Sequence, residues 1–187
     1  MANVATILLA AGVISMAEVP VAVAQNATLQ VCLRNDAHVA DDTLEEARRV
    51  VSDTYSQARL ALSWGLDDCT VTIILRPRAS DDTARRAKDA MGYTPGGGEE
   101  RGHLAFVLIN RVNEIADGYS TARSLVLGAA IAHELGHLLI SKEHSHTGIM
   151  KASLNQSDFR KARNGELRLT DEQARHIRNS SATYLSE

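Results

Sequence analysis

The segment His133-Glu134-Leu135-Gly136-His137 combines the residue types that metal-dependent hydrolases use. Residues four apart lie one turn apart on the same face of an α-helix, so both imidazoles can bind one ion. Glu134 projects about 100° away from His133, close enough to take a proton from a water molecule that the metal activates. The motif therefore predicts a site for Zn²⁺, with Glu134 as the general base.

A catalytic zinc ion usually has three protein ligands and one open position, so the motif needs a third ligand. The segment that follows supplies two candidate histidines, His144 and His146, and a more distant acid such as Asp158 or Glu166 is a further alternative. The histidine that does not bind the metal is expected to lie at the surface near the mouth of the site.

Residues 133–150 resemble the zinc motif of the metzincin peptidases, in which HExxHxxGxxH is followed by a turn with a methionine beneath the metal. Two positions depart from that pattern. Ile140 stands where metzincins have glycine, and Glu143 stands at the expected third histidine, so that His144 comes one residue late. The longer spacer and the Gly-Ile-Met ending are similar to those of small secreted bacterial proteins of metzincin type.

The resemblance implies that His133, His137 and His144 bind zinc, and that residues 147–150 form the methionine turn, in which Gly148 supplies backbone freedom. It implies an α+β fold with a small mixed sheet and a backing helix before the zinc helix, and a C-terminal helix after the turn. The implied activity is that of a zinc-dependent endopeptidase with peptide or protein substrates.

Hydrophobic periodicity predicts the strands that must support this motif. Three short strands are expected, at residues 28–33, 70–75 and 104–109. The third is either an interior strand or an exposed edge that receives an extended substrate.

Three helices are expected from the same patterns. The first begins at Asp42 or Thr43 and carries an apolar stripe as far as Leu62. The second, residues 121–140, is a long buried helix that contains the zinc motif. The third is opened by a capping box at residues 170–173.

Two further segments lack regular patterning. Residues 80–90 are expected to form a surface helix or a loop, and residues 93–102, which include Pro95 and three consecutive glycines, a flexible connector. The resulting order of strands and helices fits a single domain of the α/β or α+β class.

The N-terminus has the form of an export signal. Residues 6–17 are an apolar block of suitable length, although no Lys or Arg precedes it, and residues 22–24 have the small-x-small form of a cleavage site. We therefore expect a signal peptide over residues 1–24 and one catalytic domain over residues 25–187, in a secreted or periplasmic protein. The alternative is a buried N-terminal element or an uncleaved anchor.

The chain has two cysteines, Cys32 and Cys69, each near a predicted strand. An exported protein meets an oxidising compartment, so we expect the two to form a disulfide. The alternative is a pair of buried thiols.

Composition excludes several classes of protein. Of 187 residues, 44% are hydrophobic and 23% are charged, which excludes global disorder. The net charge of -3, without a long basic run, argues against nucleic-acid binding. No apolar stretch reaches the roughly 18 residues of a stable membrane span.

Two functions other than peptide hydrolysis are open. One is a catalytically silent zinc-binding or interaction domain on the same scaffold, against which the intact Glu134 argues, because a structural site needs no base. The other is zinc-dependent hydrolysis of a non-peptide amide, which would use the same activation of water.

Overall fold

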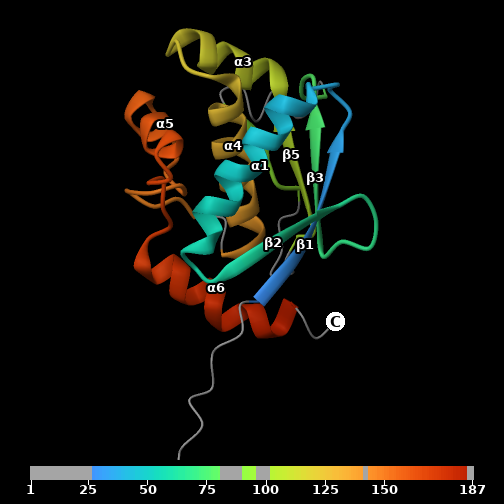
Figure 1. Ribbon diagram of the computed structural model, residues 1–187, viewed down its shortest axis with the longest axis vertical. Coiled ribbons are helices and arrows are strands. Elements are labelled where there is room, and N and C mark those ends of the chain that lie inside the picture. Colours follow the sequence, from blue (N-terminus) through green and yellow to red (C-terminus); the bar gives the residue numbers. More distant parts are fainter. Residues whose placement is uncertain (1–26, 81–89, 96–101, 141–142, 185–187) are drawn as a thin grey trace, which may run out of the picture.

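The structure is a computed structural model that describes residues 27–80, 90–95, 102–140 and 143–184 (Figure 1). The predicted signal peptide lies outside these residues. So do most of the predicted surface segment at 80–90 and the three glycines of the predicted connector.

Five strands form one sheet in the order β2-β1-β3-β5-β4. They are β1 (Ala27–Asn35), β2 (Leu60–Gly65), β3 (Val71–Arg76), β4 (Gly92–Tyr93) and β5 (Leu104–Leu108). The first four in that order pair in parallel, and β4 pairs antiparallel to β5 at the edge. The sheet is therefore mixed, which confirms the α+β class in this general form.

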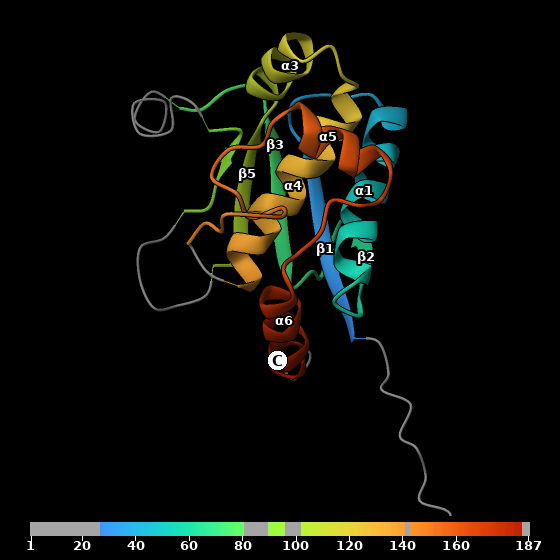
Figure 2. The ribbon, with the colours of Figure 1, turned by 90° about the vertical axis from the view of Figure 1, so that its left-hand side faces the viewer.

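The described helices cover one face of this sheet and lie at both of its ends. They are α1 (Asp41–Ser56), α3 (Ile109–Gly118), α4 (Arg123–Leu139), α5 (Gln156–Arg163) and α6 (Asp171–Tyr184). Figures 1 and 2 show α1 and α4 side by side against the same face of the sheet, with α6 at the end where β1 begins. Among the described helices, none is long and apolar enough to cross a membrane.

The core lies between the sheet and the pair α1 and α4. Val71, Ile73 and Leu75 of β3 are fully buried because alternate side chains of a strand point to the same face. Helix α4 is buried over most of its length, as expected of a helix that is apolar on nearly all sides. Any polar side chain on it therefore needs a partner or a cavity.

The predicted disulfide is present. Cys32 of β1 is joined to Cys69, just before β3, with 5.5 Å between the Cα atoms. The bond ties two neighbouring parallel strands together at the side of the sheet opposite α1 and α4.

The prediction that the first helix extends to Leu62 is wrong. Helix α1 ends at Ser56, Arg59 has a φ of 57°, and residues 60–65 form strand β2 beside β1. The apolar spacing of four residues between Ala58 and Leu62 fits a strand as well as a helix, because four is a multiple of two and close to 3.6.

The sequence patterns missed three further elements. Strand β4 has two residues, of which Tyr93 lies within the predicted connector and Gly92 just before it, and α3 follows β5 without a turn. Helix α5 begins with a capping box between Asn155 and Asp158, a signal that was present in the sequence. Because β5 lies between β3 and β4, the segment from residue 104 is an interior strand and the edge of the sheet is β4.

Candidate metal centre

Helix α4 places the two histidines of the motif one turn apart near its C-terminal end. The Nε2 atoms of His133 and His137 are 3.0 Å apart, and both side chains are half-buried. The four-residue spacing alone produces this geometry, because α4 is regular through both positions.

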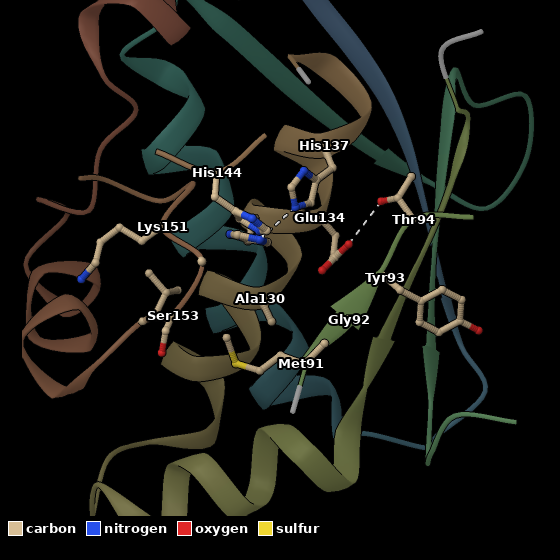
Figure 3. A pocket seen from close by; sticks show the side chains of 14 residues that line it. Met91, Gly92, Tyr93, Thr94, Ala130, Glu134, His137, His144, Lys151 and Ser153 are labelled. Atoms are coloured by element: carbon tan, nitrogen blue, oxygen red, sulfur yellow. Dashed lines mark hydrogen bonds between the residues drawn. The ribbon is translucent and has the colours of Figure 1, made fainter. Parts of the chain in front are cut away.

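His144 reaches the same point from the segment that follows α4. Its ring stacks on that of His133, with 5.2 Å between the ring centroids, and meets the His137 ring edge-on at 5.0 Å. One ligand nitrogen from each of the three rings lies within 4.8 Å of the others. Figure 3 shows the His137 and His144 side chains converging on one side of α4.

The three imidazoles could hold a metal ion. Tetrahedral zinc with Zn–N bonds of 2.0–2.1 Å requires ligand nitrogens about 3.3 Å apart, and the measured 3.0 Å between His133 and His137 is close to that. Three histidine nitrogens also leave one coordination position open, which is the arrangement of catalytic rather than structural zinc sites.

A backbone carbonyl orients His133. Its Nδ1 lies 2.8 Å from the carbonyl oxygen of Ile149, so Nδ1 carries the proton and Nε2 is left to bind an ion. Burial lowers the pKa of the imidazole from 6.5 to about 4, with the neighbouring His137 and His144 adding to the effect and the Ile149 bond opposing it. His133 is therefore neutral, and able to bind a metal, at neutral pH.

Glu134 lies beside the histidines and is only 4% exposed. Burial raises the pKa of its carboxyl from 4.5 to about 8, and a hydrogen bond from Thr94 opposes that rise. Thr94 Oγ1 donates to Glu134 Oε2 over 3.2 Å. A cation held by the histidines would favour the carboxylate form, which is the form that can act as a base.

Met150 packs against the turn of α4 that carries the two motif histidines. Its side chain is buried against Gly136, in the helical turn between the two histidines of the motif. The chain reaches it through Gly148, whose φ of 75° is the backbone freedom that the sequence predicted at that position. The amide of Ile149 donates to the carbonyl of Arg168 over 2.9 Å, which anchors the turn.

A cavity of about 350 Å³ opens in front of the three histidines. Its walls also include Glu134, Met91, Gly92, Thr94, Ala130 and Leu154. Tyr93 and Thr94 belong to the segment 93–102 that the sequence predicted as a connector, and Met91 and Gly92 were in no predicted element, so their place in the site was missed. A two-residue strand leaves no periodic signal by which it could have been found.

The structure does not bring the other candidate ligands to this point. His146 is exposed and is not part of the histidine group. Asp158 is buried, and its carboxylate is held by Lys151 at 2.6 Å and by the amide of Asn155 at 3.0 Å. Glu166 is exposed, and it lines a different cavity.

Comparison with known proteins identifies no family. No protein-family model matches the chain, and no curated protein matches it. Among solved structures, the chain is similar to the solution structure of TM1509 from Thermotoga maritima, with 11% sequence identity, 83% of this chain and 93% of that chain covered, and a TM-score of 0.35. A TM-score of 0.35 is too low to support an inference about fold or function.

Proposed function

We propose that this protein is an exported, zinc-dependent peptidase of metzincin-like fold, in which His133, His137 and His144 hold the zinc ion and Glu134 is the general base. The observation that carries the proposal is the placement of a buried carboxyl beside three converging imidazoles in one cavity. That combination supplies a ligand set and a base, the two parts that metal-assisted hydrolysis needs.

The residues divide the chemistry between them. A zinc ion bound by the histidines would act as a Lewis acid toward a carbonyl oxygen and acidify a water molecule. Glu134 is placed to accept the proton of that water and to deliver it to the leaving amine. Its burial keeps bulk water from competing for the proton.

The free edge of β4 supports a peptide as the substrate. The amide of Leu108 donates to the carbonyl of Met91 over 2.7 Å, so Met91 and Leu108 form a hydrogen-bonded pair of the antiparallel ladder. Such pairs alternate with non-bonded ones, so the N–H and C=O of Gly92 point away from β5. No other described strand pairs with that edge. Gly92 is buried but lines the cavity, so an extended peptide that adds to this edge would reach its backbone groups through the cavity.

Export is supported by the disulfide. Disulfides persist in oxidising compartments and are rare in the cytosol, and Cys32 and Cys69 are joined. With the signal-like residues 1–24, this favours a secreted or periplasmic location.

The alternatives fit the site less well. A silent zinc-binding domain would favour four protein ligands, and among the described residues the histidine group has three members. Hydrolysis of a non-peptide amide would not use the free backbone groups of Gly92.

The test is paired. Mature protein is loaded with zinc, the metal content per chain is measured, and a mixed peptide library is digested with the wild type and with Glu134→Gln. We expect one zinc per chain in both proteins and cleavage that falls by at least about 10³-fold in the variant. A wild type that holds one zinc per chain and cleaves no peptide contradicts the proposed function.

A further inference from the structure

We infer that strand β4 and the residue that follows it set the position of the Glu134 carboxylate, with Thr94 as a positioning residue and Gly92 as a position that must lack a side chain. The inference rests on the proposed function, because it assigns to the edge strand a part in presenting the general base. The motif on α4 carries no information about this contact, which comes from a segment about 40 positions earlier in the chain.

Thr94 holds one of the two carboxylate oxygens. Its Oγ1 donates to Oε2 of Glu134 over 3.2 Å. Figure 3 shows the Thr94 hydroxyl facing the carboxylate, with Oε1 on the side away from Thr94. One oxygen is thus held by Thr94 and the other is left for the proton transfer.

Gly92 lies against the same carboxylate. A Cβ at position 92 would lie 2.7 Å from both Cγ and Oε1 of Glu134, and 2.5 Å from the carbonyl oxygen of Phe106. The Phe106 carbonyl belongs to the backbone of an interior strand and cannot yield. A side chain at position 92 would therefore displace the Glu134 carboxylate and also shift the backbone of β4 away from Phe106.

The alternation of the strand explains why these two residues act together. Gly92 of β4 and Thr94, the residue that follows the strand, both face Glu134 of α4, as expected where an extended chain continues past Tyr93 and its side chains alternate. Tyr93 lies on the opposite side and stacks on Phe106 with 4.8 Å between ring centroids, and Figure 3 shows it directed away from the cavity. This stacking anchors β4 to β5 in the register that aims Thr94 at Glu134.

Position matters for a base on a long side chain. A glutamate has three side-chain torsions, and a carboxylate displaced by about 1 Å from its productive geometry loses rate steeply. The strand removes that freedom with one hydrogen bond and one close backbone contact. β4 is also the strand to which the proposed peptide substrate adds, so the base and the peptide are both positioned by the same strand.

The kinetic test uses Thr94→Val, which keeps the shape and removes the hydroxyl, and Thr94→Ser, which keeps the hydroxyl. Thr72→Val on β3 is the matched control, since Thr72 does not line the cavity. We expect kcat of Thr94→Val to fall about 10- to 100-fold with KM nearly unchanged, and Thr94→Ser to recover most of the loss. Gly92→Ala should lower kcat at least as much, and zinc content should stay at the wild-type level in all of them.

A second readout does not depend on activity. Urea unfolding of the metal-free protein is measured for Thr94→Val, Glu134→Ala and the double variant. We expect the double variant to be less destabilised than the sum of the single ones, because each single change leaves a partner without its bond, the buried Glu134 carboxyl or the half-buried Thr94 hydroxyl. The pair Thr72→Val and Glu134→Ala should be additive.

The outcomes separate the two proposals. Additive unfolding together with wild-type kinetics of Thr94→Val overturns the inference. A zinc-loaded wild type that cleaves no peptide overturns the proposed function, and the unfolding cycle then decides by itself whether Thr94 holds Glu134.

Discussion

The thioether of Met150 fills the space that a side chain at position 136 would occupy. A Cβ on Gly136 would overlap the sulfur of Met150 and would lie 3.3 Å from the hydroxyl of Tyr55. That hydroxyl in turn donates to the carbonyl of Ala132 over 2.8 Å. The turn of α4 that carries the histidines is therefore supported from below by one close sulfur contact and one buried hydrogen bond.

Gly136→Ala is expected to destabilise the protein and to weaken metal binding. The added methyl group must push Met150 away from α4 in a closely packed core, which costs about 1–3 kcal/mol, and the displaced turn shifts Ile149, the partner of His133. The free energy of unfolding in urea and the zinc affinity measure the two effects.

Gly118→Ala is the matched control, because a Cβ at position 118 meets nothing within 4 Å. It should leave stability unchanged or raise it slightly. Equal stability of the two alanine variants would contradict the proposed role of the Met150 contact.

The two late histidines should differ sharply in zinc affinity. His144 lies in the histidine group and His146 is exposed outside it. We expect His144→Ala to weaken zinc binding by at least about 100-fold and His146→Ala to change it by less than about threefold. Competition titration against a chromophoric chelator measures both, and a larger loss in His146→Ala would overturn the assignment of the third ligand.

Metal-free protein should lose stability as the pH rises toward 8, because of Glu134. Burial raises the pKa of this carboxyl from 4.5 in the unfolded chain to about 8 in the folded protein, so the folded state holds a proton that the unfolded state has lost. The stability is fully present below pH 4.5 and is lost as the pH passes through about 8. From about pH 5.5 to pH 8 the change is on the order of 3 kcal/mol.

The variant Glu134→Gln isolates this effect. Glutamine has no titratable proton, and His133 and the other titratable groups are unchanged in the variant. Urea unfolding with a chelator present should show the wild type falling relative to the variant between pH 5.5 and pH 8. Parallel curves for the two proteins would show that Glu134 is not buried as described.

The disulfide should contribute measurably to stability. Cys32 and Cys69 close a loop with a sequence separation of 37, for which loop-closure entropy gives about 2–4 kcal/mol. Replacing both by serine should lower the urea midpoint accordingly. A reducing agent should lower the wild-type midpoint to that of the variant and leave the variant unaffected, and a midpoint that does not respond would contradict the estimate.

The sequence predicted those features of the fold that depend on local patterning. Apolar patterning located β1, β3, β5 and α4, because each carries an alternating or continuous apolar run of the length of a strand or a helix. The same patterning predicted the wrong element at residues 60–65, where a spacing of four fits both the helical and the strand period. It did not predict β4, which is too short to show a period. The capping box at residues 170–173 formed as predicted, with Thr170 and Gln173 exchanging hydrogen bonds.

The features of the candidate site also fall into those that local patterns predict and those that they do not. Local spacing is enough to predict that His133 and His137 share one face of a helix with Glu134 beside them, because helical geometry follows from spacing within one segment. The spacing left open whether His144 or His146 comes within reach. The folded protein brings His144 there, and it places Gly92 and Thr94 against the carboxylate of Glu134. These contacts join segments far apart in the chain, and their geometry is set by the register of the sheet and the packing of α4, which no local pattern encodes.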